Sequence, residues 1–267
     1  MAHTIYENFV LENKIEDMLD TQLALSQFCT VDNSLTANAG MKKIIHKYTA
    51  TGDVQDLAMG VGNSTDIEVT FTDEEYEVGT TQGRFKYYDE QEMTDPMVVD
   101  TGLAGIAAKM TNDLTSKIID ELDKATLTFD ASATGLTFDN VVDAIAQYPY
   151  ESEGGLFLLI NMADKANLRK ALGDELKYVE DFARTGYIGT VCGVPVYVSK
   201  AVPEYTAYLA TKEAVTLFYK KGSEIEQERD ANVRQNSVYA RKVMLVALTD
   251  ATKVIKITTG TASTANG

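Results

Sequence analysis

The sequence is that of a strongly acidic chain with a globular composition. Its 267 residues are 45% hydrophobic and 24% charged and include only 4 prolines, which excludes a wholly disordered chain. With 40 acidic and 24 basic residues, the net charge is −16. Tight binding to nucleic acid needs clustered Lys and Arg, so it is not expected. No apolar run approaches the roughly 20 residues of a membrane-spanning helix, and no secretory signal is visible.

The first hundred residues are predicted to contain polar strands that need a partner. Apolar residues over 6–28 have a patchy helical spacing, which predicts one or two helices. Residues 41–48 and 67–72 are predicted strands, separated by a glycine-rich acidic stretch. Residues 50–100 contain few apolar side chains, and an isolated hairpin is only marginally stable in water. We therefore expect another surface to cover these strands.

The clearest single element is a long amphipathic helix. Apolar residues recur at spacings of three and four from Leu103 to Leu122, which predicts a helix over residues 99–125. Asp100 or Thr101 is the expected N-terminal cap.

Helices and strands alternate in the second half of the chain. Residues 156–160 form an uninterrupted apolar run, which is typical of a buried strand, and Thr137 is the expected cap of a helix. Residues 237–248 and 253–257 are predicted to form a closing β-hairpin. The remaining predictions are helices over 137–148 and 163–172 and strands over 194–198, 208–210 and 215–219. The fold class expected from this order is α+β.

No assembled chemical site is visible in the sequence. His3 and His46 have no ligand at metal-binding spacing, and Cys192 lies between apolar residues. The two cysteines cannot form a disulfide framework, which favours a reducing compartment. We therefore expect no catalytic residues, no cofactor and no metal. A soluble α/β enzyme with an unrecognised site is kept as an alternative.

Three stretches, in this order, resemble a known family. They are the approach to the long helix at 88–96, the glycine-strand segment at 185–199, which contains Gly193-Val194-Pro195-Val196, and the closing region at 222–257. Together they resemble the major capsid protein of tailed bacteriophages, a fold shared with encapsulins and the herpesvirus capsid floor.

The resemblance implies a division of the chain into named parts. These are an N-terminal arm at 1–40, an extended hairpin (E-loop) at 41–78, a P-domain at 79–134 with its spine helix at about 99–125, an A-domain at 135–222, a return to the P-domain at 223–257 and a flexible tail at 258–267.

The resemblance also implies a function. Copies of the chain are expected to form hexamers and pentamers of an icosahedral shell around double-stranded DNA, with only non-specific DNA contact and no membrane. Scaffolding protein, maturation protease, portal and decoration proteins are possible partners. The shell would be part of the virion and be assembled in the host bacterial cytoplasm. An encapsulin-like compartment is a further alternative.

Charge suggests which residues would meet between subunits. The hairpin is acidic, whereas residues 201–267 hold more bases than acids. We expect acids of one subunit to face bases of the next. The candidate acids are Asp53, Asp56, Asp66, Glu68, Glu74 and Glu75, and the candidate bases are Arg229, Arg234, Arg241 and Lys242.

Overall fold

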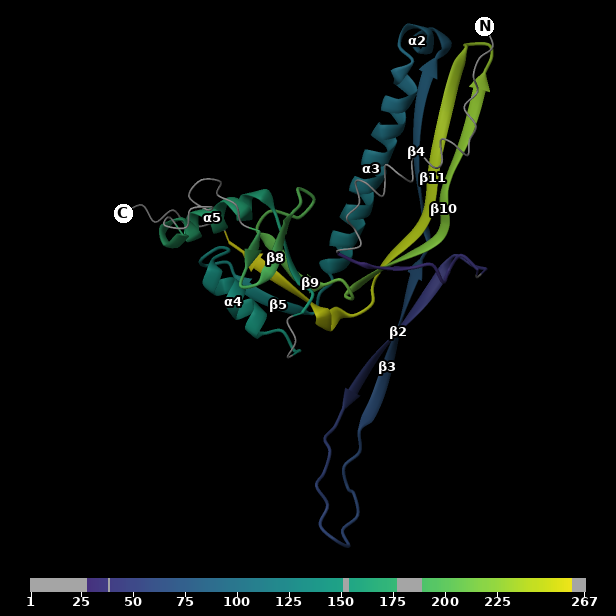
Figure 1. Cartoon of the computed structure of the whole chain (residues 1–267). Coiled ribbons are helices and arrows are strands. Elements are labelled where there is room, and N and C mark those ends of the chain that lie inside the picture. The colour runs from purple at the N-terminus through teal and green to yellow at the C-terminus, as the bar shows by residue number, and fades with distance from the viewer. Residues whose placement is uncertain (1–27, 38, 151–153, 177–188, 261–267) are drawn as a thin grey trace.

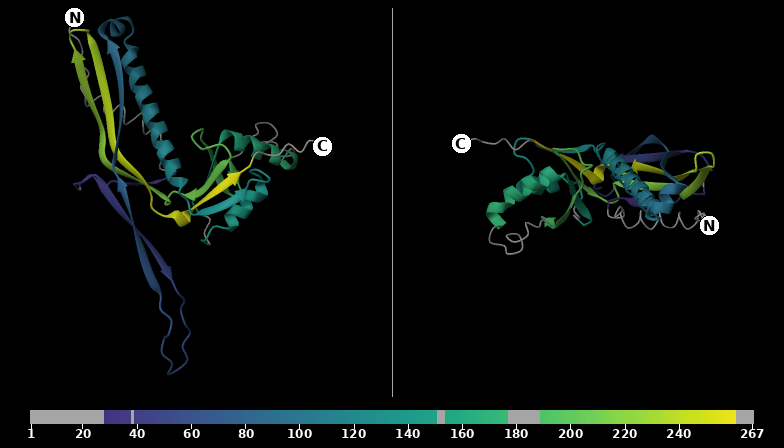
Figure 2. Two further views of the ribbon diagram at one scale, coloured as in Figure 1. Left: turned by 180° about the vertical axis from the view of Figure 1, so that it is seen from behind. Right: turned by 90° about the horizontal axis from the view of Figure 1, so that it is seen from above.

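The computed structural model, which describes residues 28–37, 39–150, 154–176 and 189–260, has three parts (Figure 1). A four-stranded sheet lies beside one long helix, a six-stranded sheet carries two further helices, and a two-stranded ribbon projects away from both (Figures 1 and 2). This mixture of helices and sheets agrees with the predicted α+β class. The helical segment predicted over 6–28 lies almost wholly outside the described residues.

The long helix α3 spans Met97–Leu122, close to its predicted range. Its cap differs from the prediction, because Pro96 is the N-cap residue and Asp95 accepts a hydrogen bond from the backbone NH of Met97 at 3.0 Å. Proline suits the start of a helix, since the first NH groups have no partner within the helix. Asp100 and Thr101 lie inside the first turns.

The four-stranded sheet has the order β1-β10-β11-β4, and α3 packs along it. Helix and strand approach closely at Gly102, where a Cβ atom would lie 2.6 Å from the ring of Phe85. The apolar stripe of α3 meets Tyr87, Ile225 and Val238 of the sheet. The elements are β1 (Thr30–Asp32), β4 (Gly79–Tyr88), β10 (Val215–Asp230) and β11 (Gln235–Leu248), with the short helix α2 (Asp89–Thr94) between β4 and α3.

The six-stranded sheet has the order β5-β12-β9-β6-β8-β7. It forms one apolar core with α4 and α5, and a second cluster joins it to α3, β10 and β11. All five residues of β6 are buried, as predicted, and Thr137 caps α4 by accepting a hydrogen bond from Asn140. The elements are β5 (Leu127–Ala131), α4 (Phe138–Ala146), β6 (Leu156–Ile160), α5 (Met162–Leu176), β7 (Thr190–Val191), β8 (Val194–Val198), β9 (Thr206–Thr211) and β12 (Val254–Thr259).

The predicted closing hairpin is wrong. Strand β11 pairs with β10 and β4, whereas β12 pairs with β5 and β9 of the other sheet. The backbone NH groups of Thr249 and Asp250 both bond to the carbonyl of Ala214, and the 3₁₀ turn η2 (Ala251–Lys253) follows. These bonds direct the chain from one sheet into the other instead of folding it back.

The predicted flexible tail begins too early. Thr258 and Thr259 belong to β12, and the buried Thr259 side chain donates a hydrogen bond to Asp164 at 2.9 Å. Residues 261–267 lie outside the described part of the chain.

The ribbon consists of β2 (Lys42–Thr51) and β3 (Glu68–Glu77), which confirms the two predicted strands. Its base joins a small apolar cluster of the body that includes Leu35, Phe218 and Leu245. Beyond the base the ribbon continues into a loop far from both sheets (Figure 1). The ribbon therefore has support at one end only.

Candidate subunit interface

The two faces of the ribbon have different surroundings. Residues directly opposite each other in an antiparallel pair lie on the same face. One face, here called the outer face, carries the cross-strand pairs Ile44/Glu75, His46/Asp73, Tyr48/Phe71 and Ala50/Val69. The other, the inner face, carries Lys43/Tyr76, Ile45/Glu74, Lys47/Thr72, Thr49/Thr70 and Thr51/Glu68.

The inner face packs on the body of the same chain at the base of the ribbon. The ammonium group of Lys43 lies 5.2 Å from the ring centre of Phe218, and that of Lys124 lies 5.4 Å from the ring centre of Tyr76. Tyr76 is buried, and this burial raises the pKa of its hydroxyl group. The inner face is thus the anchored face.

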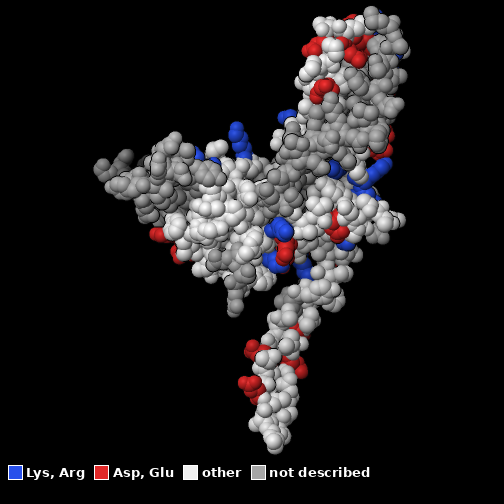
Figure 3. Space-filling model, in the orientation of Figure 1, with Lys and Arg blue, Asp and Glu red and all other residues white. Residues whose placement is uncertain are grey.

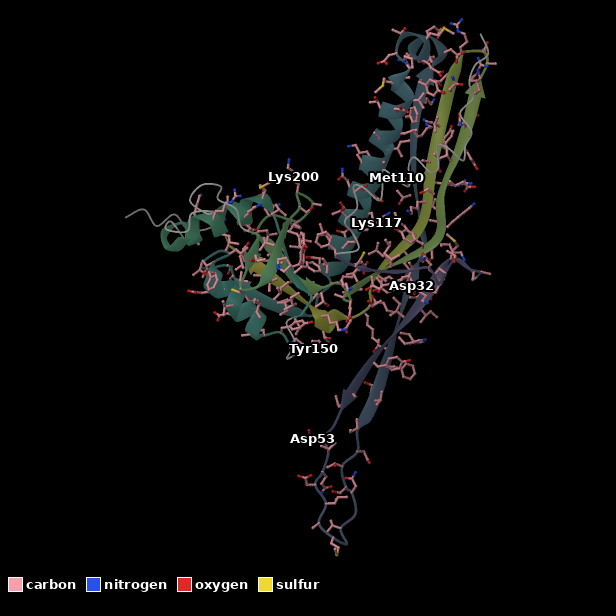
Figure 4. The ribbon with its side chains drawn as sticks, viewed as in Figure 1. Asp32, Asp53, Met110, Lys117, Tyr150 and Lys200 are labelled. Atoms are coloured by element: carbon pink, nitrogen blue, oxygen red, sulfur yellow. The ribbon has the colours of Figure 1, made fainter. Side chains whose placement is uncertain are left out.

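The predicted acids of the hairpin fall into two groups. Glu74 pairs with Lys47 and Glu75 pairs with Lys42, both across the ribbon. The lysine holds the pKa of Glu74 below its usual value. The other four predicted acids lie at the far end of the ribbon and in its loop: Asp53, Asp56, Asp66 and Glu68. They are exposed and form no ion pair with any described residue. Acids are red in Figure 3, and Asp53 is labelled in Figure 4. These four, here called the tip acids, are free to meet a partner.

The predicted bases are all engaged within their own chain. Arg229 pairs with Asp89 at 2.7 Å, and Arg234 pairs with Glu90 at 2.8 Å. Lys242 lies over the ring of Tyr219 at 4.5 Å.

Arg241 joins two acids of the neighbouring strand. It contacts Glu224 at 2.7 Å and Glu226 at 2.8 Å. Arg241 and then Lys221 hold the pKa of Glu224 at about 2. Cross-strand register creates these pairs, and register cannot be deduced from charge pattern alone.

Two bases that the sequence did not single out are better placed to receive acids. Lys86 and Lys109 are exposed and form no ion pair among the described residues. Lys86 lines a groove of about 760 Å³ between β4, α2 and α3, whose apolar lining includes Phe85 and Val98. Lys109 lies two turns along α3 from Gly102 of the same groove. Here these two lysines are called the free lysines.

The described residues contain no group of three or more His, Cys, Asp or Glu side chains that could hold a metal ion. His46 does have an acidic neighbour, Asp73, which pairs with it across the ribbon. Asp164 is the one described carboxylate with a buried oxygen that lacks a hydrogen-bond partner, and burial raises its pKa. No helix of the described chain is long and apolar enough to cross a membrane.

The structure thus combines a long helix on a narrow sheet, a second compact sheet and a projecting ribbon. The family described as phage capsid protein matches residues 72–257. The chain therefore belongs to the phage capsid protein family, and its role is that of a phage major capsid protein.

Comparisons over the full length agree. The major capsid protein of Staphylococcus phage phiMR11 is 26% identical over 261 residues, which cover 95% of this chain and 93% of that protein. The capsid of Ralstonia phage GP4 has a TM-score of 0.67 at 12% identity, covering 90% of this chain and 88% of the other.

A virus-like particle from Pyrococcus furiosus has a TM-score of 0.64 at 12% identity, covering 95% of this chain and 100% of the other. At these identities the solved structures show a shared fold. The family and the curated relative favour a phage capsid protein over the encapsulin-like compartment and the enzyme.

Proposed function

We propose that the chain assembles into hexamers and pentamers of an icosahedral shell that encloses double-stranded DNA, and that the ribbon of each subunit covers a neighbouring subunit. The ribbon is the observation that carries this proposal. Its two strands have ten residues each and only their base joins an apolar cluster. An unsupported two-stranded ribbon is marginal in water, and exposed apolar patches mark interaction sites.

The parts of the molecule then take distinct roles. The ribbon, with residues 41–78, acts as the E-loop. Helix α3 and the four-stranded sheet form the P-domain, and the six-stranded sheet with α4 and α5 forms the A-domain. The proposed partners in assembly are scaffolding protein, maturation protease, portal and decoration proteins. The assembled protein is part of the virion, which is built in the bacterial cytoplasm.

Charge guides the contact between neighbours in this proposal. The tip acids and the free lysines have no ion-pair partner among the described residues. Arg229, Arg234, Arg241 and Lys242 are less suited, because each would have to leave a partner it already has. An exposed pair contributes only about 0–1 kcal/mol, so these charges orient the contact and apolar burial holds it. The acidic surface also repels DNA phosphates, which keeps packaged DNA from binding tightly.

Shortening the ribbon tests this proposal. Residues 53–65 are replaced by Asn-Gly, a dipeptide that favours a tight hairpin turn. We expect the circular dichroism spectrum and thermal unfolding to match the wild type, while negative-stain electron microscopy shows shells for the wild type and none for the variant. Recovery of nuclease-protected double-stranded DNA from wild-type virions tests whether the shell encloses DNA.

A same-length Gly/Ser replacement of residues 53–65 is the matched control, because it keeps the reach of the loop and removes only its side chains. We expect it to assemble poorly as well. Normal shells from the shortened variant would contradict the role of the ribbon. A wild-type chain that forms no shell under any assembly condition would overturn the proposed function.

A further inference from the structure

The outer face of the ribbon carries an aromatic cluster that nothing in the described chain covers. Tyr48 and Phe71 are opposite each other, with ring centres 6.3 Å apart, and the ring of His46 lies 6.3 Å from Tyr48 and 6.5 Å from Phe71. Tyr48 is 69% exposed and Phe71 is 65% exposed. Val69 extends the same face toward the loop. Large aromatic rings are a major source of binding energy when buried, so their joint exposure indicates a docking surface.

The charged groups on this face have partners across the ribbon, which lowers the cost of removing water from it. His46 is paired with Asp73, and Lys42 is paired with Glu75, both across the ribbon. Charges that enter an interface already paired do not leave an isolated buried charge, which is the most costly outcome. The same stretch of the inner face is rich in threonine instead, as at Thr70 and Thr72. The outer face of the ribbon is therefore better suited than the inner face to be buried in an interface.

The occupant must come from outside the chain's own body. At the base, the body lies against the inner face through Lys43 and Tyr76, and the outer face points away from it. A nucleic acid does not fit, because the adjoining loop carries the tip acids. A second copy does fit, since its groove offers an apolar floor of Phe85 and Val98 beside a free lysine, Lys86. The two acids of this groove are already engaged, Glu90 with Arg234 and Asp95 with the backbone NH of Met97.

We propose that the outer face, centred on Tyr48 and Phe71, docks on a second copy of this chain, and that the inner-face threonines beyond the base stay in water. This rests on the proposed function and adds to it the face and the residues that make the contact. The partner surface is the groove between β4, α2 and α3 of the second copy. Its apolar floor contacts the aromatic rings of the ribbon, and its free lysines face the tip acids.

Adjacent substitutions on opposite faces test the assignment. Phe71→Lys places a charge on the outer face, and Thr70→Lys places the same charge one residue away on the inner face. We expect Phe71→Lys to lower the shell yield at least about tenfold, since losing one buried aromatic contact exceeds the roughly 1.4 kcal/mol that a factor of ten requires. Thr70→Lys is expected to stay within about twofold of the wild type. Circular dichroism confirms that both variants fold.

Hydroxyl-radical footprinting of the wild type gives an independent readout that needs no variant. We expect Tyr48 and Phe71 to be reactive in unassembled subunits and protected in shells. Three results would overturn the assignment: shells from Phe71→Lys at normal yield, loss of shells with Thr70→Lys alone, or protection of Tyr48 already in the unassembled subunit. In each case the wild type still forms shells, which separates these results from a failure of the proposed function.

Discussion

Arg229 and Arg234 lie five residues apart and pair with adjacent acids of α2, but the two acids differ in burial. The side chain of Asp89 is 8% exposed and also accepts a hydrogen bond from Asn236 at 2.8 Å. The side chain of Glu90 is 57% exposed. A buried carboxylate that loses its partner keeps its desolvation cost, whereas an exposed one returns to water.

Replacing each arginine with alanine measures this difference. We expect Arg229→Ala to lower the free energy of unfolding by about 1–3 kcal/mol, because a nearly buried carboxylate loses a charged hydrogen bond. Arg234→Ala is expected to cost no more than about 1 kcal/mol. Urea unfolding of unassembled subunits measures both, and each variant controls for the other. Equal losses would show that the burial of Asp89 does not determine the energetics of the pair.

Two glycines of α3 differ in their surroundings, because only Gly102 faces β4. A Cβ atom at Gly102 would lie 2.6 Å from the Phe85 ring, whereas one at Gly105 would meet no atom within 4 Å. In the interior of a helix, alanine is favoured over glycine by up to about 1 kcal/mol unless it clashes. The same substitution therefore has opposite expected effects three residues apart.

We expect Gly102→Ala to lower the free energy of unfolding by about 1–3 kcal/mol, because Phe85 must shift or the helix must move away from the sheet. Gly105→Ala is expected to raise it by up to about 1 kcal/mol. Thermal unfolding followed by circular dichroism measures both. A stabilising Gly102→Ala would mean that the Phe85 ring moves aside freely.

Elements with a strong periodic pattern were predictable from sequence. Helix α3 follows apolar spacings of three and four, and β6 is one apolar run between glycines and Asn161. The pairing of β11 and β12 with different sheets was not predictable, because two strands joined by a short turn usually pair with each other. Here the bonds of Thr249 and Asp250 to Ala214 decide the path instead. Such contacts depend on residues distant in the sequence.

The candidate interface was predictable to a similar extent. Polarity between residues 50 and 100 correctly indicated strands with little core of their own. It did not indicate which bases were already engaged, because pairs such as Arg241 with Glu224 depend on strand register. The aromatic outer face likewise arises only when the register places Tyr48 beside Phe71.

At the scale of the whole molecule, the tip acids and the free lysines lie on separate parts. The tip acids extend away from both sheets, while Lys86 lies on β4 and Lys109 lies on α3, the elements that Figure 1 labels. Unpaired charges on separate parts of a subunit accelerate the meeting of copies, and salt screens this effect.

Reversing the tip acids should therefore slow assembly in a salt-dependent way. We expect Asp53→Lys, Asp56→Lys and Asp66→Lys together to slow shell formation most at low salt, because the screening length falls from about 30 Å at 0.01 M to about 3 Å at 1 M. Light scattering measures the rate. Adding Lys86→Glu and Lys109→Glu should restore part of it. An effect independent of salt, or no rescue, would exclude pairing between these groups.

The position of β12 has a consequence for the timing of synthesis. This strand is the last of the described strands in chain order, yet it lies inside the six-stranded sheet, between β5 and β9. The ribbon strands, in contrast, leave the ribosome early. A growing chain thus exposes its ribbon before the six-stranded sheet can close, because β5 and β9 lack the strand between them until β12 is made. Completion of β12 is therefore the step that joins β5 to the rest of the six-stranded sheet.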